Sequence, residues 1–195
     1  MNNVTCTAFP LKEKKFLIVH GYTASPDKNW FPWLKSELEA LGAFVNVPTM
    51  PDSLAPHPKR WQQRLQHLPF DIDENTVLIG HSLGCITALR FLQNTGQLVA
   101  GYVLVSGFDE TQETLPELQH HTLEPLNYEE LIQIANNRIS IISTNDEIVS
   151  PRSSKALAEA LKTQVIIEES AGHFLDREGY TEFKTLLDTI KTHFS

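Results

Sequence analysis

The stretch Thr76-Val-Leu-Ile-Gly80-His81-Ser82-Leu83-Gly84 decides how this chain folds. It starts as a short apolar run, which is typical of a strand buried on both faces of a parallel sheet. The residues that follow, 83–93, are predicted to form a helix. The glycine, serine and glycine therefore stand at G-x-S-x-G spacing where a strand turns into a helix. In that context the motif presents a serine nucleophile.

The sharp turn explains why these residue types are needed. It holds the central residue in a strained backbone conformation, and the flanking glycines make room for close approach of the chain. The turn also lifts the Ser82 hydroxyl above the sheet edge, at a helix N-terminus where the dipole favours developing negative charge. A serine that only caps a helix beside a packing glycine is the alternative interpretation. The strand before the motif and the helix after it favour Ser82 as a nucleophile.

Outward from this stretch, strand-like and helix-like segments alternate, which predicts a parallel sheet with crossover helices. Short apolar runs predict six strands, at residues 16–20, 44–47, 76–80, 99–105, 138–143 and 164–168. Helical spacing predicts helices over 30–41, 59–68, 83–93 and 151–161, and a last helix with Tyr180, Phe183, Leu187 and Ile190 on its apolar side. The predicted fold class is α/β, a three-layer α/β/α sandwich with about six parallel strands and no large cap. The longest irregular part, 107–127, is either a small lid or a surface loop.

Length and composition set the outer limits of the function. The 195 residues suit one domain over 15–195, preceded by a loose N-terminal segment over 1–14. A net charge of −8 argues against nucleic acid as a partner, and no apolar run is long enough to cross a bilayer. The start has no signal-peptide pattern, and Cys6 and Cys85 make no disulfide framework, so we expect a cytoplasmic protein. The sequence makes no prediction of the oligomeric state.

A serine hydroxyl needs a base, and the chain offers eight histidines. His173 stands in Ser170-Ala-Gly-His173-Phe174, directly after the last predicted strand. In folds that carry the serine at a strand-to-helix G-x-S-x-G turn, the chain order is serine, acid, histidine, and the histidine follows the last strand, so His173 is the predicted base. We expect His20 to shape the site from a strand end and His81 to point away from it. Solvated positions on loops or helix surfaces are expected for the others, His57, His67, His120, His121 and His193. The pair at 120–121 lacks further ligands, so no metal or cofactor is predicted.

The carboxylate that orients the histidine should lie between Ser82 and His173, just past a strand. Asp146 is the first carboxylate beyond the predicted fifth strand and is preferred; Asp109, after the fourth strand, is the alternative. Two backbone N–H groups should bind the oxyanion. The residue after the nucleophile, Leu83, is predicted to supply one, and Tyr22, at the end of the first strand, the other.

With these residues in view, the chain resembles the small serine hydrolases that include retinoblastoma-binding protein nine and the bacterial YdeN-like proteins. The motifs that carry the resemblance are His20-Gly21-Tyr22, Ser25-Pro26, Asn29-Trp30-Phe31-Pro32-Trp33-Leu34 and Val47-Pro48-Thr49-Met50-Pro51. The resemblance implies a compact α/β-hydrolase fold without the large cap of bigger hydrolases. It also implies a triad of Ser82, Asp146 and His173, and esterase-like activity with amide cleavage in some relatives. In the relatives named for it, retinoblastoma binding rests on an L-x-C-x-E motif. The nearest match here, Leu83-Gly-Cys85-Ile-Thr87, lacks the glutamate, so we do not expect this role.

The sequence therefore predicts a serine hydrolase that cleaves small acyl esters, or amides, through an acyl-enzyme intermediate. A binding or scaffold protein on the same fold, with an idle triad, is the alternative that the sequence leaves open. The aromatic residues Trp30, Phe31 and Trp33 are expected to pack the first helix rather than to line a substrate pocket. Trp30, nearest the loop after the first strand, is the best pocket candidate among them, and Phe174, next to His173, is the second candidate. Short acyl groups are expected, because the segment 107–127 offers only three leucines, Leu115, Leu118 and Leu123, as an apolar underside.

Overall fold

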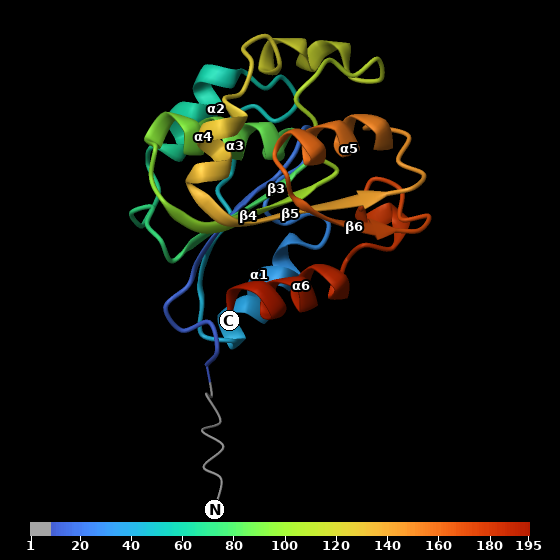
Figure 1. Ribbon diagram of the computed structural model, residues 1–195. Coiled ribbons are helices and arrows are strands. Elements are labelled where there is room, and N and C mark those ends of the chain that lie inside the picture. Colours follow the sequence, from blue (N-terminus) through green and yellow to red (C-terminus); the bar gives the residue numbers. More distant parts are fainter. Residues whose placement is uncertain (1–8) are drawn as a thin grey trace, which may run out of the picture.

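A parallel sheet forms the centre of the protein. In the computed structural model, which describes residues 9–195, six strands follow the order β2-β1-β3-β4-β5-β6, and every neighbouring pair is parallel (Figure 1). The strands are β1 (Lys15–Val19), β2 (Phe44–Asn46), β3 (Thr76–His81), β4 (Val99–Val105), β5 (Ala135–Ser143) and β6 (Gln164–Glu168). All six predicted strands are confirmed, with ends that shift by three residues or fewer.

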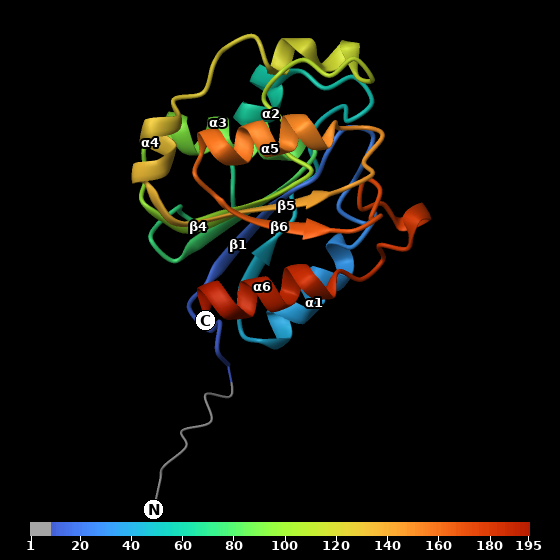
Figure 2. The ribbon, with the colours of Figure 1, turned by 45° about the vertical axis from the view of Figure 1, so that its right-hand side comes forward.

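Helices cover both faces of the sheet, as Figures 1 and 2 show together. One face carries α1 (Phe31–Ala40) and α6 (Lys184–Phe194). The other carries α2 (Pro58–Leu65), α3 (Leu83–Thr95), α4 (Tyr128–Gln133) and α5 (Pro151–Ala160). Because helices lie on both sides, every residue of β3 is buried, which explains its continuous apolar run. The predicted three-layer α/β/α sandwich is confirmed.

Each face of the sheet has its own apolar core. Leu17, Trp61 and Leu89 belong to the core under α2 and α3, while Phe16, Phe31 and Ile190 belong to the core under α1 and α6. Residues 16 and 17 thus point to opposite faces, as the alternation of a strand requires. The sheet is held by apolar contacts on both sides, so the strand ends that carry polar residues sit on a rigid support.

Some elements differ from those expected. The short helix α4 was not predicted, and a 3₁₀ helix, η1 (Pro116–His121), lies within the segment 107–127. The six residues of α4 are too few for a helical pattern to stand out in sequence; its start is capped by Asn127, whose side chain accepts the Glu130 N–H. The last helix begins only at Lys184, after a second 3₁₀ turn, η2 (Asp176–Glu178).

The N-terminal boundary also differs from the prediction. Residues 1–8, with Cys6, lie outside the described part of the chain. Leu11 is fully buried, and its N–H donates to the Leu41 carbonyl at 3.1 Å. The packed domain therefore begins before Lys15, earlier than the predicted boundary after residue 14. Across residues 9–195, no helix combines the length and apolar character needed to cross a membrane.

The order of the strands creates the place for a site. The chain adds β2 on one side of β1 and β3 on the other, with Val19 of β1 in register with Gly80 of β3. In open α/β sheets such a reversal opens a crevice at the carboxyl ends of the two strands, where ligands bind. The stretch that ends at Ser82 leads directly into this crevice.

Candidate active site

Ser82 sits in a strained turn between β3 and α3. Its φ is 54° and its ψ is −122°, in a region that side-chain-bearing residues rarely adopt. The turn is held because the Ser82 N–H donates to the Val105 carbonyl and the Cys85 N–H donates to the Ser82 carbonyl, both at 2.9 Å. A Cβ on Gly80 would come within 2.5 Å of the Cys85 Cα, and one on Gly84 would collide with the Val19 carbonyl. Both glycines of the motif are therefore required by close backbone approach.

His173 and Asp146 meet in a buried pair. Nδ1 of His173 lies 2.7 Å from Oδ2 of Asp146, and both side chains are almost fully enclosed. The other carboxylate oxygen, Oδ1, accepts the N–H groups of Ile148 and Val149, each at 2.9 Å. Burial by itself would raise the pKa of Asp146, but the hydrogen bond and charge of His173 outweigh it and hold that pKa below its ordinary value. The carboxyl is thus kept ionised beside the imidazole.

Ser106 is a further partner of this carboxylate that sequence reasoning missed. Its hydroxyl donates to Oδ2 of Asp146 at 2.7 Å, from a backbone with φ of 48° directly after β4. Asp146 was selected because it follows a strand, and Ser106 also follows one directly. Because parallel strands end at the same edge of the sheet, this position in the sequence was the signal that could have identified Ser106.

The alternative acid, Asp109, points elsewhere. Its Oδ2 accepts the Tyr128 hydroxyl at 2.5 Å, and burial raises its pKa above the ordinary value. The structure therefore brings Asp146, and not Asp109, against the imidazole of His173.

The loop that carries His173 is clamped at several points. The Glu178 carboxylate accepts the N–H groups of His173 and Leu175, at 2.8 and 3.0 Å, and Asn145 Oδ1 accepts the Gly172 N–H at 2.8 Å. Gly172 has φ of 60°, and a Cβ there would collide with the Glu178 carboxylate. Neither Asn145 nor Glu178 was predicted. Nothing in the local pattern marks Glu178, because its contact depends on how the loop folds back.

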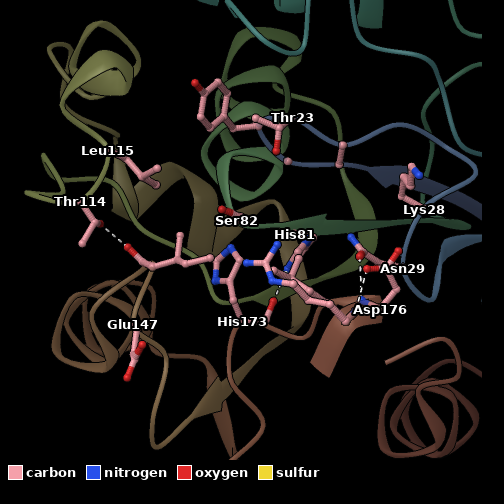
Figure 3. Close-up of a pocket in the computed structure, with 16 residues that line it drawn as sticks. Thr23, Lys28, Asn29, His81, Ser82, Thr114, Leu115, Glu147, His173 and Asp176 are labelled. Carbon is pink, nitrogen blue, oxygen red and sulfur yellow. Dashed lines mark hydrogen bonds between the residues drawn. The ribbon is translucent and has the colours of Figure 1, made fainter. Parts of the chain in front are cut away.

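His81 does not point away from the site, contrary to the prediction. It lines the cavity beside Ser82, and its Nε2 lies 2.8 Å from the carbonyl oxygen of His173, to which it donates (Figure 3). The two imidazole rings are 4.9 Å apart. Burial, and after it the charge of His173, lowers the pKa of His81 to about 3. A neutral His81 therefore links the turn of Ser82 to the loop of His173.

A cavity of about 410 Å³ opens over Ser82 and His173, with residues from four loops around it. Besides these two and His81, it is lined by Gly21, Tyr22, Thr23, Ala24, Lys28, Asn29, Thr114, Leu115, Glu147, Ile148, Leu175, Asp176 and Arg177. Tyr22 thus borders the cavity, as expected of the loop after β1, and a hydrogen bond that its phenol donates to the Glu117 carboxylate raises the pKa of that phenol. Part of the segment 107–127 forms one wall, through Thr114 and Leu115.

Trp30 and Phe174 do not form walls of this cavity, so their prediction as pocket residues is wrong. Both are fully buried in the core under α1 and α6. Trp30 packs edge-on against Phe31 and Phe183, and the Phe174 ring stacks on Phe183 at 5.0 Å. The left-handed backbone of Phe174, with φ of 57°, accompanies a ring buried beneath the loop. A large aromatic ring stabilises the fold more when it is buried in the apolar core than when it is exposed at the mouth of a polar cavity.

The chain is similar to known proteins over nearly its whole length. The family model described as serine hydrolase matches residues 16–192, which is nearly the whole chain. The chain belongs to the serine hydrolase family. Its relatives in that family include YdeN of Bacillus subtilis (strain 168), which is 36% identical over 93% of this chain and 97% of its own. The serine hydrolase RBBP9 of Rattus norvegicus is 26% identical over 84% of this chain and 85% of its own.

A solved crystal structure shows the same fold. The crystal structure of the B. subtilis ydeN gene product superimposes with a TM-score of 0.90, and covers 93% of this chain and 98% of its own. The resemblance inferred from the motifs around residues 20–51 is thereby confirmed, and so is the α/β-hydrolase fold.

Proposed function

We propose that this serine hydrolase cleaves small acyl esters, or the matching amides, through an acyl-enzyme formed on Ser82. One observation carries the proposal: His173, which pairs with the buried Asp146, and the strained Ser82 line the same cavity. Because Nδ1 of His173 is engaged by Asp146, its Nε2 is left with a lone pair that can accept the serine proton. Asp146 fixes the tautomer and stabilises the imidazolium that forms.

In the proposed reaction, the Ser82 Oγ attacks the substrate carbonyl while His173 takes the hydroxyl proton. The tetrahedral intermediate collapses with loss of the alcohol or amine, to which His173 returns that proton. Water, deprotonated by the same imidazole, then cleaves the acyl-enzyme. We assign the oxyanion to the backbone N–H groups of Leu83 and Tyr22. Their placement is supported by Gly21, on which a Cβ would lie 3.1 Å from the Ser82 Cβ.

The preference for short acyl groups follows from the walls of the cavity. Of the three leucines available in the segment 107–127, only Leu115 lines it; Leu118 is buried in the core and Leu123 is exposed. Ile148, Leu175 and the ring of Tyr22 add the remaining larger apolar surface. Each buried methylene contributes about 0.8 kcal/mol to binding, and this wall is large enough to bury only the first few carbons of an acyl chain.

A cytoplasmic location stays a prediction from the sequence.

Labelling with a fluorophosphonate tests the nucleophile, and hydrolysis of p-nitrophenyl acetate tests the activity. We expect wild-type protein to be labelled and active, and Ser82→Ala to lose labelling and about 10⁴-fold or more in kcat while staying folded. Ser36→Ala, at an exposed serine of α1, is the matched control and should behave as wild type. If intact wild-type protein is neither labelled nor active, the scaffold alternative is favoured. If Ser82→Ala keeps most of the turnover, another residue is the nucleophile.

A further inference from the structure

The two ends of the cavity differ in chemical character (Figure 3). Thr114, Leu115 and Glu147 lie toward one end, and Lys28, Asn29 and Asp176 toward the other, with Ser82 and His173 between them. Arg177, which follows Asp176, also lines the cavity. The end with Leu115 and Ile148 suits the acyl group of the proposed function. The remaining end, with two cationic side chains, is the end left for the leaving group.

The cationic end is built from two loops that are far apart in the sequence. The N–H of Asp176 donates to Asn29 Oδ1 at 3.0 Å, which joins the segment before α1 to the turn η2. The backbone of Lys28 is held on both sides, because its N–H donates to the Ser25 carbonyl and its own carbonyl accepts the Phe31 N–H. The backbone positions from which Lys28 and Arg177 extend are therefore fixed relative to one another.

Within the described residues, 9–195, both cationic side chains lack an ion-pair partner. No carboxylate among residues 9–195 lies within 4.0 Å of the Lys28 or Arg177 side-chain nitrogens. The neighbouring carboxylates have other hydrogen bonds: Asp176 Oδ1 accepts the Arg177 backbone N–H at 2.7 Å, and Asp27 Oδ1 accepts the Ser25 hydroxyl at 2.5 Å. Glu178 binds the His173 loop, as described above. Two basic side chains with unused donors stand at the cavity of a chain in which 24 acidic residues outnumber 16 basic ones.

We propose that the preferred substrates of this hydrolase carry a carboxylate in the leaving group, and that Lys28 and Arg177 bind it. The proposal rests on the hydrolase function above and adds the charge and orientation of the substrate. Arginine suits a carboxylate because its planar fork donates two parallel hydrogen bonds, and lysine adds a point charge. Cleavage transfers the acyl group to Ser82 and releases a hydroxy- or amino-carboxylate, whose new O–H or N–H proton comes from His173.

The test compares two butyrate esters that differ in one charge. These are 4-(butyryloxy)benzoate, which is anionic, and its neutral methyl ester, assayed with wild type, Lys28→Met, Arg177→Met and the double variant. The measured quantity is the ratio of kcat/KM for the anionic ester to that for the neutral one; comparing the ratio between variants cancels the intrinsic reactivity of the esters. We expect each single variant to lower the ratio about 3- to 10-fold, as for a solvent-accessible charge-assisted contact. Lys155→Met, at an exposed lysine of α5, is the matched control and should keep the wild-type ratio.

Salt gives a second readout, because screening weakens exposed charge pairs. Raising the ionic strength from about 0.05 to 0.5 M should lower the wild-type ratio and leave that of the double variant nearly constant. A ratio that is the same in wild type and the double variant overturns the proposal while leaving the hydrolase function intact. Absence of hydrolysis of both esters by a protein that fluorophosphonate does not label overturns the hydrolase function itself, and this proposal with it.

Discussion

Acidification should destabilise this protein through His81. Its side chain is buried, and its pKa is lowered from the ordinary 6.5 to about 3, first by burial and then by the charge of His173. A second proton would sit on Nδ1, for which residues 9–195 offer no hydrogen-bond partner. Between about pH 6.5 and pH 3, His81 is therefore protonated in the unfolded chain but neutral in the folded chain. The contribution of His81 to stability is complete above that pH and is lost as the pH falls from 6.5 toward 3.

The size of the effect follows from the two pKa values. One pKa unit corresponds to about 1.4 kcal/mol, so the folded state should lose about 2 kcal/mol of its free energy of unfolding through His81 between pH 7 and pH 5. His81→Gln separates this from other effects. A glutamine amide retains a donor for the His173 carbonyl, which His81 Nε2 contacts at 2.8 Å, but it does not titrate.

Urea unfolding at pH 7 and pH 5, followed by tryptophan fluorescence, measures the difference. Each protein is compared with itself at the two pH values, so any fixed cost of the substitution cancels. His20 and His121 also have pKa values lowered by burial, but both proteins keep them, so their contribution cancels too. We expect wild type to lose about 2 kcal/mol more than His81→Gln. An equal loss in both proteins, or a larger loss in the variant, would refute the reasoning.

Three further predictions concern the pair beside the nucleophile and the cavity wall. Asp146→Asn should lower kcat for p-nitrophenyl acetate about 10⁴-fold by disturbing the histidine, whereas Asp109→Asn should stay within a few-fold of wild type; the reverse order would move the acid to the end of β4. Ser106→Ala removes one of the donors to the Asp146 carboxylate and should cost about 10-fold in kcat with KM little changed, and a selective rise in KM would contradict that role. Across acetyl, butyryl, octanoyl and palmitoyl esters below their micellar limits, kcat/KM should peak at the short chains; a steady rise through palmitoyl would count against the cavity wall described here.

The local parts of this structure could be read from the sequence because their causes are local. A G-x-S-x-G stretch between an apolar run and a helical segment allows few backbone paths, since the glycines are needed for close approach and the serine lies in a strained turn. The strands of a doubly covered sheet must be apolar throughout, so each appears as a continuous run such as Val77-Leu-Ile-Gly80. Parallel topology then puts the residues after each strand at one edge, which led to His173 and to Asp146.

The sequence by itself thus determined which segments form the strands and helices, their order along the chain, and the positions that follow each strand at the carboxyl edge of the sheet. Only the tertiary structure decided which of those residues touch. Asp146 rather than Asp109 contacts His173, Ser106 donates to the Asp146 carboxylate, and His81 contacts the His173 carbonyl. It also buried Trp30 and Phe174 in the core and left Lys28 and Arg177 at the cavity. The physical reason is that these contacts join segments far apart in the sequence, such as His81 and His173, which are 92 residues apart. Their geometry depends on how loops and aromatic side chains pack, which no local pattern encodes.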